Sequence, residues 1–483
     1  MINLIGNEFT KIFKKKTIYI LFILIIGYIL LMNIMIKATD DGYSYYFYDE
    51  WNVEFYESSL HDLDPNDPAD RAQYIDFKTQ LDLQNLSKEY GNRSWQVFII
   101  NNKLAPYINT INSHEYSDEI TEEAYNEAKQ AYDTALEKLE SDDWKYFVNA
   151  DLAEINASLE EQNALKETTE DTATLATINN TIEDLELQKQ IDEWRLEKNI
   201  SYAPSFLNNA LDSYYSNMTQ LNSFGNVDNL DDEEYQYYQS ALEQSSLNRY
   251  YIENNISLET DNREIFINFF NQYELFILIV GIVIAGSIVS DEFNKGTIKL
   301  LLVKPYSRVK ILLAKLIVSI CMIIIAIVVI AIAQLLIGGI VFGFDSLSTP
   351  AIVYNFDTNS VETLNVFAYV ALIGIGKLPI YILLTTLAFA CSTLFTNTAL
   401  AVAVPFLGYI GANIINQLAL MYNVKQVIYF VTPNWDLTQY LFGGTPLFTE
   451  LTLPFSIGIC LVYFLIMVVV SCVVFKKRDI KNI

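Results

Sequence analysis

Long apolar stretches constrain the fold of this chain more than any other feature of its sequence. About 20 residues of helix, at about 1.5 Å per residue, cross a hydrocarbon core about 30 Å thick. Six stretches reach this length, and they lie near residues 17–36, 266–290, 316–342, 366–396, 398–420 and 453–475. The sequence therefore predicts an all-α membrane protein with six transmembrane helices.

The charge of the chain is distributed unevenly. Residues 38–265 carry 48 acidic and 14 basic side chains, a net charge of −34, whereas the remaining residues have a net charge of +7. Basic side chains gather before residue 17, within 291–315 and after residue 475. Cytoplasmic loops are enriched in Lys and Arg, and an even number of spans separates these three clusters. We therefore expect both chain ends in the cytoplasm and residues 38–265 outside the cell.

An amphipathic segment precedes the first apolar stretch. Ile5, Phe9 and Ile12 recur at helical spacing, which predicts a helix over residues 2–13 that lies in the inner membrane interface. The stretch 17–36 is longer than the apolar part of a typical signal peptide, and no small-x-small cleavage site follows it. We therefore expect residues 1–36 to form an interfacial helix and an uncleaved first span.

The predicted outer domain, residues 38–265, is acidic and expected to be mainly helical. Residues 117–199 contain neither Gly nor Pro and are rich in Glu, Ala, Leu, Lys and Gln, a composition that favours helices. A break at 167–173 indicates a hairpin of two antiparallel helices. The domain has no cysteine, so packing rather than disulfides must stabilise it. Its acidic surface is either a solvated face or a surface for cationic ligands.

The third part of the chain, residues 266–483, holds five spans and a basic loop at 291–315. This loop, DEFNKGTIKLLLVKPYSRVKILLAK, combines an acidic pair, a Gly-Thr, a Leu-rich turn and six basic residues. The acidic pair suits the positive N-terminus of a short helix. Pro305 ends that helix, and Ser307 can cap the next one. We expect Lys315 to lie in the inner interface with its amine extended to water.

This loop resembles the first cytoplasmic loop of ABC-2 type transporter permeases, and the amphipathic start and the six spans resemble that family too. The resemblance implies the membrane subunit of an ATP-driven exporter, whose coupling loop docks on a separate ABC ATPase. The alternative is a helix that only rests on lipid headgroups. The residues to which the resemblance assigns docking are Asp291, Glu292, Lys295, Gly296, Thr297, Leu301, Pro305, Ser307 and Arg308.

Several chemical sites are not predicted for this chain. No G-x-x-x-x-G-K-[ST] segment occurs in the sequence, and its two histidines stand alone, so we expect neither a nucleotide site, a catalytic site nor a metal site here. ATP and magnesium are expected on the partner ATPase. The other expected partners are the lipid bilayer and a second permease protomer, identical or related; nucleic acid is not among them.

Two ionisable residues, Glu274 and Lys377, fall inside predicted spans at similar depth. Charges within a membrane are rare and usually functional, so both are candidates for the substrate pathway. They form either a structural ion pair or separate contacts to substrate in a wet cavity. Trp435, in the last outer loop, is a further pathway candidate and suits an interfacial anchor.

The resemblance implies a permease subunit of an ABC-2 type exporter in a bacterial cytoplasmic membrane. Its outer domain is much larger than the first outer loop of many such permeases, which favours an amphipathic or peptide-like substrate: an antimicrobial peptide, a drug or a lipid-like molecule. The alternatives are an ATP-independent multi-span surface receptor or adhesin, and an accessory protein similar to the phage-infection-protein type.

Overall fold

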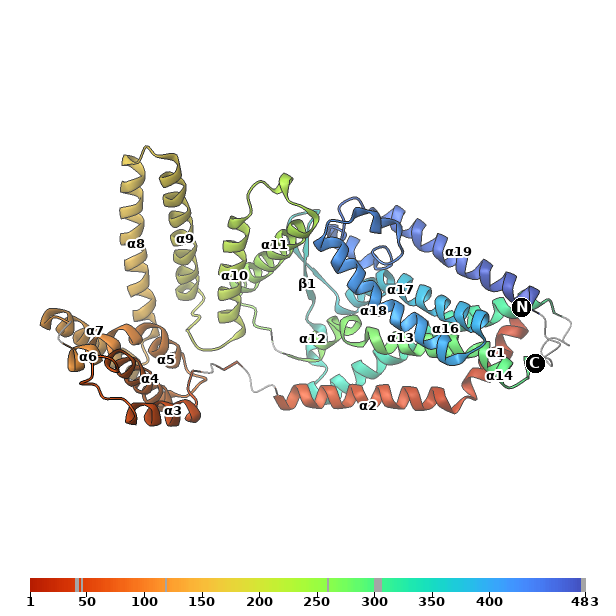
Figure 1. Ribbon diagram of the computed structural model, residues 1–483, viewed down its shortest axis with the longest axis horizontal. Helices are drawn as coiled ribbons and strands as arrows, with labels where there is room; N and C mark the ends of the chain where they lie inside the picture. The colour runs from red at the N-terminus through yellow and green to blue at the C-terminus, as the bar shows by residue number, and fades with distance from the viewer. Residues whose placement is uncertain (40–42, 45–46, 118–119, 259, 299–305, 479–483) are drawn as a thin grey trace. The chain divides into compact units, whose positions relative to one another are not determined.

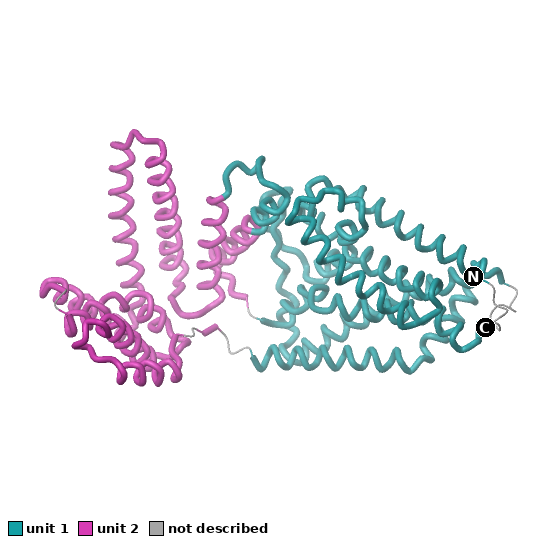
Figure 2. The backbone as a smooth tube through the Cα atoms, in the orientation of Figure 1, with its two compact units in different colours: residues 1–40, 224–240, 259–483 teal, residues 41–223, 241–258 magenta. Residues whose placement is uncertain are grey.

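The structure, a computed structural model, is helical over most of its length (Figure 1). It describes residues 1–39, 43–44, 47–117, 120–258, 260–298 and 306–478. The chain forms two compact units, which are coloured separately in Figure 2. Unit 1 comprises residues 1–40, 224–240 and 259–483, and unit 2 comprises residues 41–223 and 241–258. Residues 224–240, which lie within the predicted outer domain, thus group with the long apolar helices.

Unit 1 is built from long apolar helices. Six helices of the described chain are long and apolar enough to cross a membrane, in agreement with the predicted all-α membrane protein and its six candidate spans. Among these, α13 is the most buried, and it packs against α16, α17 and α18. The six are α2 (Lys16–Thr39), α13 with its extension α14 (Phe269–Ile288 and Ser290–Asn294), α16 (Arg308–Phe342), α17 (Val366–Phe395), α18 (Thr398–Met421) and α19 (Leu453–Lys477).

Shorter elements lie at the two ends of this bundle. We call the end where α2 begins and α19 ends the basic end, and the opposite end the loop end. The predicted amphipathic helix is confirmed as α1 (Ile2–Phe13), and it packs against α16 at the basic end. The other short helices of unit 1 are η2 (Val227–Asn229), α12 (Asn262–Ile267), η3 (Asp345–Ser348), η4 (Lys425–Tyr429) and η5 (Leu437–Gly443).

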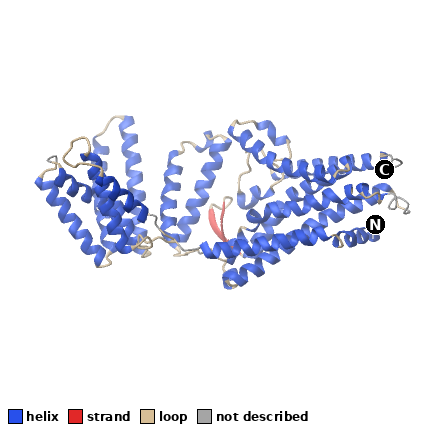
Figure 3. Ribbon diagram, turned by 60° about the horizontal axis from the view of Figure 1, so that its bottom comes forward, coloured by secondary structure: helices blue, strands red, loops and turns tan. Residues whose placement is uncertain are grey.

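A β-hairpin between α16 and α17 was not predicted. Strands β1 (Ala351–Asn355) and β2 (Ser360–Leu364) pair antiparallel, with Ala351 opposite Leu364 and Asn355 opposite Ser360 (Figure 3). The β-branched residues of AIVYN and SVETL favour strands. The turn FDTN between them includes Asn359, whose positive φ of 48° suits a tight turn. These two signals could have revealed the hairpin.

Unit 2 is entirely helical in the described residues. Helices α8 and α9 form the predicted hairpin, since α8 ends at Thr168 and α9 begins at Thr172. A further helix, α7, precedes this hairpin within residues 117–199. The chain breaks between α7 and α8 at Asp142, which adopts a positive φ of 56°, and Asp143 then caps the start of α8. Its helices are α3 (Glu50–His61), α4 (Arg71–Tyr90), α5 (Trp95–Ile99), η1 (Ile100–Leu104), α6 (Ala105–Tyr116), α7 (Glu122–Glu140), α8 (Trp144–Thr168), α9 (Thr172–Glu197), α10 (Phe206–Ser223) and most of α11 (Asp232–Glu253).

A buried amide pair fastens α2 to the bundle. The Asn33 amide donates to Gln334 Oε1 at 3.0 Å, and the Gln334 amide donates back to Asn33 Oδ1 at 3.2 Å. The Tyr273 hydroxyl also donates to Gln334 Oε1, at 2.6 Å. All three side chains are buried among apolar helices, where an unpaired amide is costly.

Replacing Asn33 by leucine should destabilise unit 1 by about 1–2 kcal/mol, because Gln334 loses both of its amide contacts to α2. Thermal unfolding of the purified full chain in detergent measures this loss. The triple variant Asn33→Leu/Tyr273→Phe/Gln334→Leu should recover part of the stability, since none of the three buried polar groups is then left without its partner. An Asn33→Leu protein as stable as the unsubstituted chain would contradict this account.

Candidate functional site

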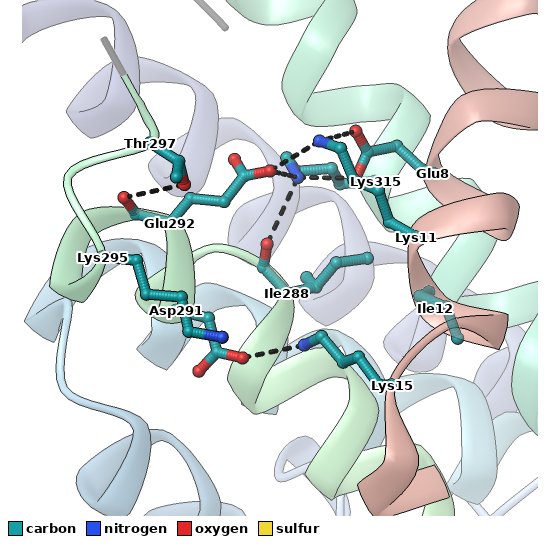
Figure 4. A pocket seen from close by; sticks show the side chains of 10 residues that line it. All are labelled: Glu8, Lys11, Ile12, Lys15, Ile288, Asp291, Glu292, Lys295, Thr297 and Lys315. Carbon is teal, nitrogen blue, oxygen red and sulfur yellow. Dashed lines mark hydrogen bonds and ion pairs between the residues drawn. The ribbon is translucent and has the colours of Figure 1, made fainter. Parts of the chain in front are cut away.

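Four charged side chains form a closed ring at the basic end of the bundle (Figure 4). The ammonium of Lys315 lies 2.7 Å from Glu8 Oε2 and 2.8 Å from Glu292 Oε1. The ammonium of Lys11 lies 2.8 Å from Glu8 Oε1 and 2.8 Å from Glu292 Oε1. Each charge therefore contacts two charges of opposite sign. The ring joins α1 to α14 and α16, which lie far from α1 along the chain.

Glu8 and Lys11 stay charged over the neutral pH range. Burial would raise the pKa of the Glu8 carboxyl, but Lys315 and Lys11 outweigh burial and lower that pKa below its usual value. Burial would likewise lower the pKa of Lys11, whereas Glu292 and Glu8 raise it above its usual value. The stabilising contribution of Glu8 is therefore lost only in acid, and that of Lys11 only in strong base.

The burial of Lys315 corrects one sequence-based expectation. Its side chain is 1% exposed, and its ammonium also donates to the Ile288 carbonyl at 3.3 Å. The predicted extension of this amine to water is therefore wrong. The apolar pattern of α16 could not reveal this outcome, because the compensating carboxylates come from Glu8 and Glu292 on other elements.

A second ion pair fixes α14 beside the ring. Lys15 lies 2.8 Å from Asp291 Oδ2, and the Thr398 hydroxyl donates to Asp291 Oδ1 at 3.3 Å. Next to these pairs lies a cavity of about 380 Å³. It is lined by Glu8, Lys11, Ile12, Lys15, Ile288, Asp291, Glu292, Lys295, Thr297 and Lys315 (Figure 4). The site can thus transmit a displacement of α14 to α1 and α16 through charged contacts.

The predicted docking residues fall into two groups. The carboxylates of Asp291 and Glu292 are used within the chain, whereas Lys295, Gly296 and Thr297 are exposed. Gly296 has a φ of +66° directly after α14, a conformation that favours glycine at a helix end. This geometry explains the Gly of the Gly-Thr pair. The turn 295–297 is exposed at the basic end.

The remaining docking candidates lie at the start of α16 or outside the described residues. Ser307 caps α16, since its hydroxyl accepts from the Lys310 amide at 3.3 Å, as predicted. The Arg308 guanidinium donates to the Arg478 carbonyl at 2.9 Å and so binds the end of α19. Leu301 and Pro305 lie outside the described residues.

The structure brings the two charges predicted inside the spans together. Lys377 Nζ lies 2.9 Å from Glu274 Oε2 and 2.7 Å from Asp436 Oδ2. The Tyr409 hydroxyl donates to Glu274 Oε1 at 2.7 Å. We call Glu274, Lys377 and Asp436 the Lys377 cluster. It joins α13, α17 and the loop before η5, and it carries two carboxylates for one ammonium.

Two buried hydroxyls lie on the same face of α17 as this cluster. Among the described residues, neither Tyr381 OH nor Thr385 Oγ1 has a hydrogen-bond partner, and both side chains are fully buried. Tyr381 lies within electrostatic range of Glu274 and Asp436. Unsatisfied buried hydroxyls are rare, and they mark this interface of α13 and α17 as polar beyond its ion pairs.

Trp435 does not behave as an interfacial anchor. Its side chain is 7% exposed and packs in the apolar core of unit 1, so little ring surface is left for a membrane interface and that prediction is wrong. Its place in a substrate pathway stays a prediction. The sequence analysis missed its neighbour Asp436, because a lone Asp in a loop carries no signal of an intramembrane partner.

Unit 2 contains a separate cleft of about 620 Å³ between α8, α9 and α10. Its carboxylates include Asp151, Asp192 and Asp212. Asp151 pairs with Lys103 and accepts from the Tyr202 hydroxyl at 3.1 Å. Burial and the nearby Asp151 raise the pKa of Asp192 to about 6.

This pKa predicts that unit 2 gains stability in mild acid. A carboxyl whose pKa is raised on folding stabilises the fold fully below its unfolded pKa, and this contribution is lost as the pH rises through about 6. Asp192→Asn should therefore stabilise unit 2 at pH 7 by about 2 kcal/mol and flatten its stability between about pH 4 and 6. Thermal unfolding of the full chain across this range measures the slope. The exposed neighbour Glu193→Gln is the control, and equal slopes in both variants would contradict the assignment.

These features define a multi-span membrane protein whose bundle carries a ring of charges at its basic end and the Lys377 cluster between α13 and α17. Residues 237–481 match a family described as "protein of unknown function (DUF2705)". Because this match spans half of the chain, the protein belongs to the DUF2705 family. The match includes the Lys377 cluster, Glu292 and Lys315, whereas Glu8 and Lys11 precede it.

Two proteins of Bacillus subtilis (strain 168) are similar to this chain. The "uncharacterized membrane protein YdbK" is 34% identical over 227 residues, which cover 47% of this chain and 87% of the relative. The "uncharacterized protein YhcI" is 32% identical over 241 residues, which cover 49% of this chain and 75% of the relative. No solved structure matches this chain.

Proposed function

We propose that this protein is the permease subunit of an ATP-driven ABC-2 type exporter in a bacterial cytoplasmic membrane. The observation that carries the proposal is α14, which is tied through Glu292 to α1 and α16 and through Asp291 to Lys15, while its turn 295–297 is exposed. A partner that moves this turn would move two further elements of the bundle. A helix resting on headgroups requires no such attachment.

In this proposal the basic end faces the cytoplasm and unit 2 lies outside the cell. The excess of Lys and Arg at the basic end supports that orientation. A separate ABC ATPase, with its ATP and magnesium, docks at the turn 295–297. A second protomer, identical or related, completes the transport pathway. ATP binding shifts α14, and the charged ring passes the shift to α1 and α16.

The proposed substrate is amphipathic or peptide-like. The carboxylate-lined cleft of unit 2 and its apolar side chains Ile155, Leu185 and Ile191 support a ligand with both cationic and apolar groups. Deleting the α8–α9 hairpin should change substrate handling and leave ATPase binding intact. Loss of ATPase binding on this deletion would contradict the division of roles.

A pull-down tests the proposal. The tagged chain is purified from native membranes in mild detergent, and co-purifying proteins are identified by mass spectrometry. We expect a Walker-motif ATPase that is lost when the segment Gly296–Lys304 is scrambled. Recovery of a folded chain without any ATPase in several detergents would favour the ATP-independent receptor or adhesin, or an accessory protein.

A further inference from the structure

The first turns of α11 are attached to the loop between η5 and α19. Asp232, Gln236 and Gln239 lie at i, i+4 and i+7, on one face of the helix. Asp232 Oδ1 accepts from the Thr449 amide at 3.0 Å and from the Thr449 hydroxyl at 2.7 Å. This carboxylate is buried, so its two bonds are shielded from water.

The same face makes further bonds to this loop. The Gln236 amide donates to the Pro446 carbonyl at 2.9 Å. The Gln239 amide donates to the Thr445 hydroxyl, and Gln239 Oε1 accepts from the Thr445 amide at 3.2 Å. Side chains of three residues thus satisfy polar groups at three loop positions, and their helical spacing fixes the register of this contact.

The loop in turn holds η5. The Leu447 amide donates to Gln439 Oε1 at 2.9 Å, and the Gln439 amide donates to the Pro433 carbonyl at 3.0 Å. Gln439 therefore links the loop to the segment that contains Asp436. The buried Phe448 packs with Val427 and Leu451 and anchors the loop in an apolar cluster.

At its start, η5 lies directly on α17 beside Lys377. A Cβ atom added to Gly376 would approach Thr438 Cγ2 to 2.7 Å, so the two backbones are in close contact. Asp436 Oδ1 accepts from the Thr438 amide at 3.0 Å, and Asp436 Oδ2 lies 2.7 Å from Lys377 Nζ. A change in the position of η5 therefore changes the distance between Asp436 and Lys377.

We propose that Asp232, Gln236 and Gln239 are positioning residues that hold the 445–449 loop, and through it Asp436, against Lys377. α11 is one continuous helix whose first nine residues belong to unit 1 and whose remainder belongs to unit 2. A displacement of this helix therefore alters the pairing of the intramembrane ammonium. The effect of such a displacement on transport rests on the function proposed above, whereas the positioning of Asp436 does not.

Hydrogen exchange of the full chain in nanodiscs, followed by mass spectrometry, tests the positioning. In the variant Gln239→Ala, we expect amides of residues 436–443 to exchange about tenfold faster, because two bonds that hold the loop are removed. The exposed Gln244→Ala on the same helix is the matched control and should leave these rates unchanged. Thr445→Val removes the hydroxyl partner of Gln239 without altering α11, so it provides the same test if the first variant does not fold.

Coupling to Lys377 separates positioning from a merely structural role. In a Lys377→Met background, the ion pair that Gln239 positions is absent. Gln239→Ala should then raise the exchange rate of amides 436–443 by less than half of the factor that it produces in the chain with Lys377. Asp232→Asn, which keeps the acceptor for Thr449, should stay near the unsubstituted rate, whereas Asp232→Ala should not. Unchanged exchange in Gln239→Ala and Thr445→Val, or fully additive effects with Lys377→Met, would overturn the proposal. Both readouts are independent of any ATPase, so they are unaffected if the pull-down finds none.

Discussion

Replacing Lys315 by methionine is expected to destabilise unit 1 by about 3–5 kcal/mol. The ammonium is 1% exposed and lies between the carboxylates of Glu8 and Glu292. Without it, the buried carboxylate of Glu8 and the largely buried carboxylate of Glu292 share the single ammonium of Lys11. Methionine has a similar length, so the loss reports the missing charge rather than a cavity. Thermal unfolding of the full chain in nanodiscs measures it.

Two further variants isolate the role of the ring. Lys310→Met removes an exposed ammonium from the same helix and should change stability by no more than about 0.5 kcal/mol. Adding Glu8→Gln and Glu292→Gln to Lys315→Met should restore part of the stability, because the unpaired carboxylates are gone. Equal stabilities of the Lys315→Met and Lys310→Met proteins would show that the ring does not hold α1 and α14.

The second large effect is expected at Lys377. The substitution Lys377→Met leaves Glu274 and Asp436 without their shared ammonium, which should cost about 2–4 kcal/mol because Asp436 is partly open to solvent. Lys310→Met, which removes an exposed ammonium of the same unit, is the control and should cost no more than about 0.5 kcal/mol. A cost at Lys377 no larger than at Lys310 would contradict the importance of the cluster.

A double variant at the Lys377 cluster distinguishes a structural ion pair from residues that contact substrate. In the double variant Glu274→Gln/Lys377→Met, both charges inside the predicted spans are removed and only Asp436, which is partly open to solvent, keeps an unpaired carboxylate. A purely structural pair should therefore recover part of the stability lost in Lys377→Met, and export with it. If the residues contact substrate, stability should recover while export stays impaired. Unaltered export in both single variants and in the double variant would remove these residues from the pathway.

The sequence was informative where a local pattern determines the structure. Length and apolarity located the six long helices, and the polar break at 167–173 located the α8–α9 turn. Ser307 was predicted as a helix cap because capping depends only on neighbouring residues. Each of these predictions depends only on residues that are close together in the sequence.

The sequence was least informative where distant residues meet. Lys315 was expected at a water interface because its carboxylate partner Glu8 lies 307 positions earlier in the chain. The pairing of Lys377 with Glu274 was one of two alternatives, and Asp436 was missed because it lies in a loop. Trp435 was assigned to an interface from its residue type, although tertiary packing buries it. Which face of an apolar helix packs on which neighbour cannot be read from one helix.

Photo-crosslinking at Thr297 tests the central claim most directly. A photo-reactive amino acid is placed at this exposed position in the full chain in native membranes, and at the exposed Thr349 of the loop end as a control. We predict that position 297 crosslinks to an ATPase with a Walker motif and that position 349 does not. Crosslinks at 297 to lipid alone, or to the same ATPase from both positions, would contradict the assignment of α14 and its turn as the coupling element of an exporter.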